Sequence, residues 1–190
     1  MATQDSRIKL KRSTVNSTVP TVPSSNDHTD GTWIATDIYK GELFYNQADN
    51  VLWTRGDSGI ECIQGTAKLT IATADVLTLN TTPIEIVAAP GAGYAIEVIS
   101  ASMKMVYNSV AYATNTTLEL KVTGANSPQI QWGASVLSAT IDKFNAQSID
   151  SNSNTNVLEN APLMATVDLG DPTAGDSDIT VYVTYRIITL

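Results

Sequence analysis

Residues 179–187 have the sequence Ile-Thr-Val-Tyr-Val-Thr-Tyr-Arg-Ile, in which apolar and polar side chains alternate along the whole stretch. Successive side chains of a β-strand point to opposite faces, so the alternation predicts a strand with one buried and one exposed face. Two further stretches, 116–123 and 163–169, alternate in the same way. Their predicted inward positions are Leu118, Leu120 and Val122 in one, and Leu163, Ala165, Val167 and Leu169 in the other.

Other features of residues 75–190 agree with an all-β domain. The apolar phase of residues 94–107 shifts near Val98 and Ile99, which predicts a β-bulge or burial on both faces. Turn-forming residues gather around Pro90, Pro128 and Pro172 and separate the runs. We therefore expect seven or eight short strands, arranged as an antiparallel β-sandwich or jelly roll.

Composition points to the same fold class. Only 16% of the 190 residues are charged, well under the roughly 25% of an average soluble protein. Threonine occurs 25 times, and its branched side chain suits a half-exposed sheet face. The predicted fold is all-β.

Two regions precede this domain. Residues 1–35 form a predicted extended arm, because residues 13–30 are rich in Ser, Thr, Pro and Asn, lack hydrophobic periodicity and should take their order from a partner. Residues 36–74 contain a predicted β-hairpin, formed by strands at 42–45 and 51–54 around a polar turn, and a linker to the sandwich.

Aromatic residues of the hairpin are candidates for a contact between subunits. A lone hairpin is marginally stable in water and offers little to cover large rings. We expect Phe44, Tyr45 and Trp53 to be buried in the seam of a homotrimer. The alternative is a monomer that assembles only on a larger particle.

Charge is distributed unevenly along the chain. The net charge is −8, and residues 69–190 hold 4 basic and 11 acidic residues, a net charge of −7. This acidic half disfavours nucleic acid as a partner. The exception is a basic, amphipathic run that predicts a strand docked on a protein partner, with nucleic-acid contact as the less favoured alternative. Its residues are Arg7, Ile8, Lys9, Leu10, Lys11 and Arg12.

Residues for catalysis are scarce, and we do not expect an enzyme. The single histidine, His28, lies in the arm without partners for a catalytic triad or metal site. Cys62 is interpreted as a packing residue rather than a nucleophile. The carboxylates Asp142, Asp150 and Glu159 flank a polar loop, but their spacing does not pair them for glycoside hydrolysis.

No cofactor is expected either. Asp168, Asp171, Asp176 and Asp178 carry oxygen ligands of the kind that Ca²⁺ takes, but they lack the spacing of an EF-hand loop. A hydrated β-turn is the favoured interpretation, and a calcium site is the alternative. The sequence shows neither a secretion signal nor a run of about 18 apolar residues, so we expect no membrane partner.

Two parts of the sequence resemble bacteriophage structural proteins. The first combines Arg7–Ser13 with Gly41-Glu42-Leu43-Phe44-Tyr45-Asn46 and Ala48-Asp49-Asn50, and it is similar to the N-terminal module of tailed-phage fibre proteins. There the pattern is roughly a basic strand, a spacer and GEL-x-x-N-x-x-D-x-x-L. The second part, residues 79–93 with 160–163 and 170–176, resembles a small β domain of phage structural proteins.

The resemblance implies a virion protein, usually a homotrimer, attached by its N-terminal module to capsid or tail proteins. The chain lacks repeats and a coiled-coil stalk, which favours a short head fibre or capsid decoration protein over a main tail fibre. The alternative is a receptor-binding protein that recognises a host cell-surface glycan. Trp132, beside Gln129 and Gln131, is the C-terminal candidate for a sugar platform, although core packing or a subunit contact is the favoured interpretation.

Overall fold

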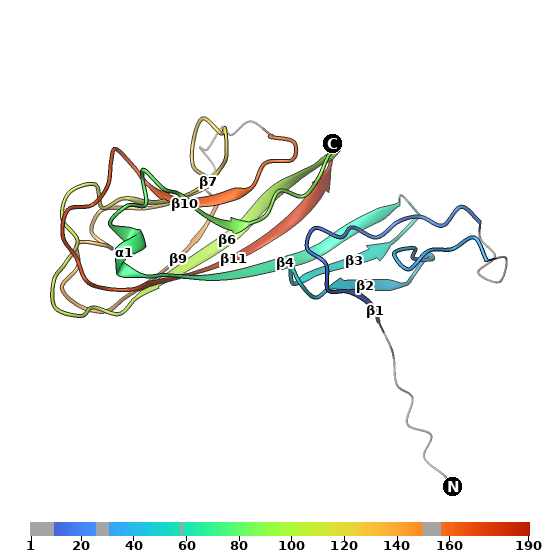
Figure 1. Ribbon diagram of the computed structural model, residues 1–190, viewed down its shortest axis with the longest axis horizontal. Coiled ribbons are helices and arrows are strands. Elements are labelled where there is room, and N and C mark those ends of the chain that lie inside the picture. The colour runs from blue at the N-terminus through green and yellow to red at the C-terminus, as the bar shows by residue number, and fades with distance from the viewer. Residues whose placement is uncertain (1–9, 26–30, 58, 150–156) are drawn as a thin grey trace, which may run out of the picture. The chain divides into compact units, whose positions relative to one another are not determined.

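The computed structural model describes residues 10–25, 31–57, 59–149 and 157–190, and it divides into two compact units (Figure 1). Unit 1 comprises Met1–Ile63 and unit 2 comprises Gln64–Leu190. The division falls within strand β4 (Ile60–Ile71), so a strand occupies most of the stretch that the sequence assigns to a linker.

Unit 1 is built around the predicted hairpin. Strands β2 (Leu43–Asn46) and β3 (Val51–Arg55) pair antiparallel, which confirms the hairpin and its turn. Strand β1 (Lys11–Ser13) adds to the free side of β2 in parallel register. The core of the unit is made of side chains that are 2% exposed or less: Ile38, Phe44, Val51 and Trp53.

The described part of the predicted arm packs on this hairpin. Beyond β1, Pro20 and Pro23 are buried, and a parallel bridge joins Thr21 to Asp37. The low periodicity of this segment predicts partner-dependent order, but residues 10–25 find their contacts within unit 1. A short polar segment can order in this way when buried side chains elsewhere in the chain hold its backbone.

Unit 2 contains two four-strand antiparallel arrangements. In the first, β4 pairs with β11 (Ile179–Thr189), β11 with β6 (Tyr94–Met105), and β6 with β9 (Lys143–Ser148). The second has the order β5-β10-β7-β8. Its strands are β5 (Ile84–Val87), β10 (Leu163–Val167), β7 (Leu118–Val122) and β8 (Ile130–Trp132).

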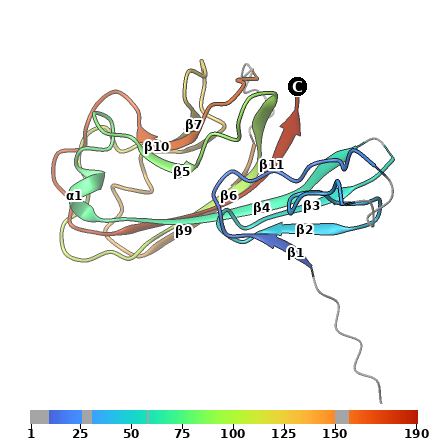
Figure 2. The same cartoon turned by 45° about the vertical axis from the view of Figure 1, so that its right-hand side comes forward.

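The two sheets of unit 2 lie one over the other (Figure 2), and apolar side chains of both sheets are buried. Ile179, Val181, Val183 and Tyr185 of β11 are each 2% exposed or less, as the alternation predicts. The inward positions of β7 and β10 through Val167 are buried as well. A single-turn helix, α1 (Thr73–Val76), contributes buried Val76. The all-β class and the sandwich are confirmed.

Two details of the strand predictions have different outcomes. The register of β11 on β6 skips from Ser100 to Val98, which leaves Ile99 as the extra residue of a bulge and confirms that alternative. Leu169 is wrong as a core position, because it is 86% exposed. Its φ of 67° shows that the chain has left the strand and entered a left-handed turn, which ends the alternation.

Candidate functional site

Asn46, at the end of β2, holds the N-terminal segment against the hairpin turn. Its side chain is almost wholly buried. Its Nδ2 lies 3.1 Å from the carbonyl oxygens of both Val15 and Thr18 and 2.6 Å from Oδ2 of Asp49. Its Oδ1 accepts a hydrogen bond from the Ala48 N–H at 3.0 Å. One amide therefore satisfies backbone groups of two segments that lie far apart in the sequence.

Asp49 reinforces this junction. Its Oδ2 also accepts the N–H of Ser17 at 2.6 Å. Burial raises the pKa of Asp49, and the hydrogen bond from Ser17 partly opposes that effect. Since Ser17 has a φ of 56°, the carboxylate fixes a turn that few residues other than glycine adopt readily.

Glu42, the residue before β2, also joins the N-terminal segment to the hairpin. Its Oε2 accepts the N–H of Tyr39 at 2.8 Å and lies 3.1 Å from Nζ of Lys11. Lys11 Nζ also donates to the carbonyl of Asp37 at 2.6 Å and lies 5.5 Å from the ring centres of Trp33 and Tyr39. The cation of β1 is thus surrounded by groups of unit 1.

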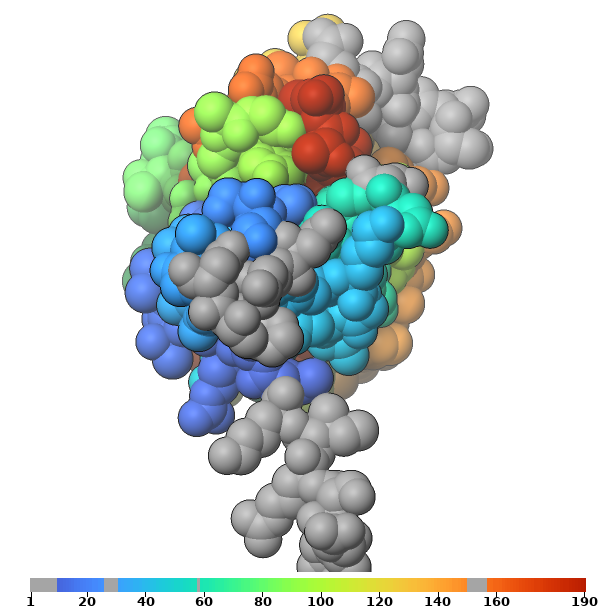
Figure 3. Space-filling model, turned by 90° about the vertical axis from the view of Figure 1, so that its right-hand side faces the viewer, coloured from blue at the N-terminus to red at the C-terminus, as the bar shows by residue number. Residues whose placement is uncertain are grey.

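A second buried carboxylate stabilises the loop before β2. Asp37 is 4% exposed and accepts hydrogen bonds from Thr21 Oγ1 at 2.6 Å and from the Ile34 N–H at 2.8 Å. These bonds hold its pKa below the usual range, assisted by the nearby charges of Lys11 and Arg55. Figure 3 shows the resulting arrangement, with blue N-terminal residues lying against the cyan hairpin.

The surface of this junction is hollowed. A cavity of about 670 Å³ is lined by Lys11, Trp33, Tyr39, Lys40 and Glu42. The indole of Trp33 is 47% exposed, and Lys40 forms an exposed ion pair of 2.7 Å with Asp57. Each lysine is already paired with a carboxylate, Lys11 with Glu42 and Lys40 with Asp57, so the two rings make a surface that suits a partner with apolar groups.

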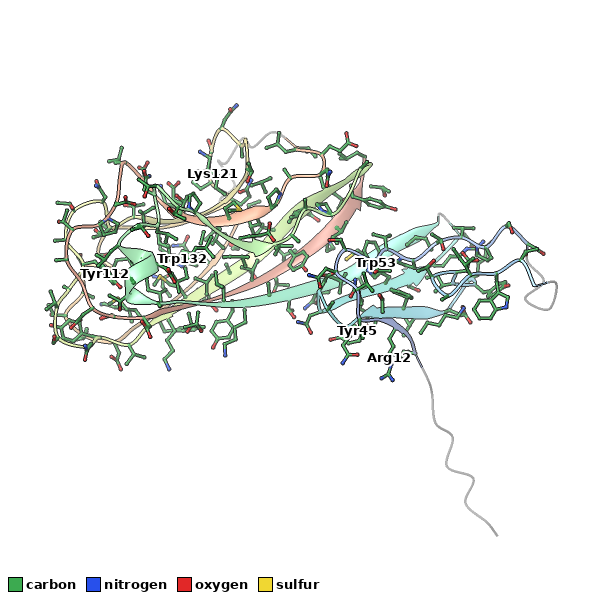
Figure 4. The ribbon with its side chains drawn as sticks, in the orientation of Figure 1. Arg12, Tyr45, Trp53, Tyr112, Lys121 and Trp132 are labelled. Carbon is green, nitrogen blue, oxygen red and sulfur yellow. The ribbon has the colours of Figure 1, made fainter. Side chains whose placement is uncertain are left out.

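Only half of the predicted docking run can be placed. Arg7, Ile8 and Lys9 lie outside the described residues. Leu10 is 45% exposed, and Arg12 points away from the hairpin (Figure 4), whereas Lys11 faces the interior contacts described above. Leu10 and Arg12 are therefore available to a partner.

The reasoning behind the predicted trimer seam is wrong for two of its three residues. Phe44 is 1% exposed and Trp53 is 2% exposed, so the chain itself covers both rings. Tyr45 is half-buried and donates from its hydroxyl to Asn50 Oδ1 at 2.8 Å. The expectation treats the hairpin as isolated, whereas other parts of the same chain cover both rings.

Several carboxylates of unit 2 accept hydrogen bonds from the backbone of separate segments. Asp171 accepts the N–H groups of Asn80 and Thr81, at 2.8 and 3.1 Å. Asp176 accepts those of Ser109 and Val110, at 3.0 and 2.9 Å. Asp178 accepts that of Thr73, Glu159 that of Gly93, and Asp142 that of Tyr107.

Each of these carboxylates is therefore a loop anchor, which agrees with the turn interpretation for Asp171, Asp176 and Asp178. Within the four described ranges, no three His, Cys, Asp or Glu side chains gather as they would around a metal ion. Cys62 is half-buried in β4, and His28 and Asp150 lie outside those ranges. Among the residues that the structure places, no helix is long and apolar enough to cross a membrane.

Trp132 lies in the sandwich core and cannot be a sugar platform. Its side chain is 0% exposed, which confirms core packing (Figure 4). Its neighbours are occupied as well. Gln129 accepts the N–H of Val122 at 2.8 Å, and Gln131 donates to Oε1 of Glu119 at 2.6 Å.

Comparison with known proteins adds little to this description. No family model matches the sequence, and neither does any curated protein. One solved structure that is similar in part is titled "Cyanophage Pam1 capsid asymmetric unit". It shares 15% identity over 65% of this chain and 84% of that chain, with a TM-score of 0.40. A similarity of this size determines neither the family nor the function.

Proposed function

We propose that this chain is a non-enzymatic structural protein of a bacteriophage virion and that unit 1 attaches it to the particle. The observation that carries the proposal is the network built by Glu42, Asn46 and Asp49. These are the Glu, Asn and Asp of the pattern that resembles phage-fibre attachment modules. In this chain they join the basic strand and its spacer to the hairpin, so the residues of the resemblance act as one structural unit.

The surface of unit 1 supports an attachment role. It exposes large apolar side chains that its own core does not use, and apolar surface of this kind is typical of interaction sites. These residues are Leu10, Val15, Val22, Trp33, Ile34 and Leu43. Exposed Arg12 adds positive charge, whereas Lys11 and Lys40 are already paired with Glu42 and Asp57. The partner surface should therefore be mainly apolar, with an acidic group near Arg12.

The finer form of the proposal is a short head fibre or decoration protein on the capsid surface, with the β-sandwich projecting. The partners would be capsid proteins of the same virion, and the oligomer would be the homotrimer that the resemblance implies. The second candidate function is a tail-fibre protein that recognises a host glycan. That candidate requires an exposed aromatic side chain in unit 2, a requirement that buried Trp132 does not meet.

Particle assembly with substituted chains tests the attachment role. The double substitution Leu10→Ser with Arg12→Glu changes only exposed side chains, so unit 1 should fold while incorporation into particles falls at least tenfold. Lys104→Glu reverses an exposed charge in unit 2 and is the matched control. Deletion of residues 2–30 should abolish incorporation, although it also removes β1 from β2.

Quantitative mass spectrometry of purified particles gives the copy number for each variant. Normal incorporation of the Leu10→Ser, Arg12→Glu variant would refute attachment through this surface. Equal losses for that variant and for Lys104→Glu would also refute it, because the effect would then not belong to unit 1.

A further inference from the structure

The outer face of β4, β11, β6 and β9 carries an ordered pattern of small hydroxyl side chains. The strand register aligns Thr66, Thr184, Ser100 and Ser148 in one row across the four strands. The next row places Lys68, Tyr182, Ser102 and Ala146 side by side. Neighbouring strands lie about 4.8 Å apart, so the first row presents four hydroxyls at a regular interval.

Two aromatic side chains border this field. Phe144, on β9, is 69% exposed, and Tyr182, on β11, is 40% exposed. Between them lies a hollow of about 390 Å³, whose floor includes Ser100, Ser102 and Ala146. A hollow of that size falls within the range of small-ligand sites, which combine aromatic surfaces with a few placed polar groups.

The hydroxyls of the hollow are available to a ligand. In the described part of the chain, the side chains of Ser100, Ser102, Ser148 and Thr184 make no hydrogen bond. Each can both donate and accept. By contrast, the carboxylates of the loops are engaged with backbone N–H groups, as described above. The field therefore differs from the loops in having unused hydrogen-bonding capacity.

The charge of the hollow restricts the class of ligand. Residues 69–190 carry 4 basic and 11 acidic residues, but the lining contains no Asp, Glu, Lys, Arg or His. Two cations border the hollow: Lys68 lies with its Nζ 5.6 Å from the Tyr182 ring centre, and exposed Lys104 lies opposite Phe144 in the strand pairing. A neutral lining on an acidic unit favours an uncharged polar ligand over a nucleic acid or an acidic peptide.

We propose that this face binds a neutral oligosaccharide. The apolar C–H face of a pyranose ring would lie on Phe144, with Tyr182 at the opposite border. Its hydroxyls would exchange hydrogen bonds with the free serine and threonine hydroxyls. This inference extends the second candidate function and does not depend on attachment through unit 1.

A glycan array probed with the full-length chain tests the proposal. The array should hold neutral hexose and N-acetylhexosamine oligosaccharides together with sialylated and sulfated ones. We expect binding to neutral members, followed by isothermal titration calorimetry with the best of them. Phe144→Ala should weaken that binding roughly tenfold or more, because it removes the stacking surface. Ser102→Val should weaken it as well, because it removes a hydroxyl from the floor of the hollow.

The control is Trp33→Ala, which removes an exposed ring of unit 1 and should leave sugar affinity unchanged. Circular dichroism and the melting temperature show whether each variant folds. Absence of binding to any neutral oligosaccharide, or binding only to charged ones, would overturn the proposal. An unchanged affinity of Phe144→Ala would also overturn it. A variant that binds no sugar but enters particles normally separates this site from the attachment role.

If the face instead joins copies of the chain, Phe144→Ala would lower the mass measured by light scattering while the unsubstituted chain binds no sugar. That result would replace the sugar site with a subunit interface.

Discussion

At the residue scale, Glu119 is a buried carboxylate of unit 2. It lies on β7 with an exposed fraction of only 6%, and its Oε1 accepts a hydrogen bond from Gln131 Nε2. Burial raises the pKa of Glu119, and the charge of Asp168 adds to that effect. The hydrogen bond from Gln131 and the charge of Lys121 oppose it. At neutral pH the folded chain therefore holds a carboxylate that the buried site disfavours.

The effect on stability has a definite sign. Since the pKa of folded Glu119 lies above the unfolded value of 4.5, the folded state binds the proton more tightly. The contribution of protonated Glu119 to the stability of the fold is present at low pH and is lost as the pH rises through the folded pKa. Glu119→Gln keeps the size and the acceptor oxygen but carries no charge. We expect it to raise the melting temperature by a few degrees at pH 7.

A pH series of melting temperatures checks this expectation. The difference between Glu119→Gln and the unsubstituted chain should shrink as the pH falls toward 4. Equal melting temperatures at pH 7 would mean that the carboxylate is not disfavoured by its site.

Gly175 is the second residue with a sharp prediction. A Cβ at this position would lie 2.1 Å from Cδ1 of Tyr112, and the φ of 113° disfavours any other residue. Tyr112 is 1% exposed, and its hydroxyl donates to the Ser177 carbonyl, so the ring has little freedom to move. We expect Gly175→Ala to lower the free energy of unfolding by roughly 2–4 kcal/mol, measured by urea denaturation.

Gly133→Ala is the control, since no heavy atom lies within 4 Å of a Cβ there. Its unfolding midpoint should change little. If Gly175→Ala were as mild as this control, the tight packing of Tyr112 on the chain at Gly175 would be incorrect.

At the element scale, β1 depends on side chains of the hairpin. Asn46→Ala removes the amide that lies 3.1 Å from the carbonyls of Val15 and Thr18. Two backbone acceptors and the Asp49 carboxylate then lose a buried donor, at a cost of roughly 1–3 kcal/mol to unit 1. We expect faster cleavage within residues 10–25 in limited proteolysis followed by mass spectrometry.

Gln47→Ala is the matched control, because the exposed side chain of Gln47 is next in sequence and its N–H still donates to the Ser13 carbonyl. Fragments from unit 2 should appear at the same rate in both variants. Identical cleavage of Asn46→Ala and Gln47→Ala would show that the amide does not hold the segment.

At the scale of the whole molecule, the property to measure is the oligomeric state, that is, the number of chains in one assembly. Burial of Phe44 and Trp53 within the chain removes the reason to place a seam at those rings. The exposed apolar side chains of unit 1 remain, and the resemblance implies a homotrimer. One chain has a mass of 20.2 kDa, so three have 3 × 20.2 = 60.6 kDa.

Multi-angle light scattering of the purified chain at micromolar concentration measures this mass directly. We expect a value near that of three chains. A single mass of one chain would contradict the preformed trimer and favour assembly only on the particle.

The sequence by itself determined four strands of the sandwich, β6, β7, β10 and β11, but not β4, which lies where the sequence predicts a linker. An alternation of period two, as in 179–187, has one structural solution when one face must be buried, and a shift in its phase at Ile99 marks a bulge. The hairpin at 43–55 could also be predicted, since its turn residues are adjacent in the chain. These features depend on neighbours within a few positions.

The tertiary structure alone decided the two candidate sites. Asn46 meets Thr18 across 28 positions, and the hydroxyl row joins four strands that are remote in sequence. Composition cannot reveal which distant segment covers a ring, so the sequence predicts a subunit seam at Phe44 and Trp53, whereas the chain itself buries both rings. Alternation along one strand predicts which of its faces is buried, but the covering segment and the cross-strand register are properties of long-range packing.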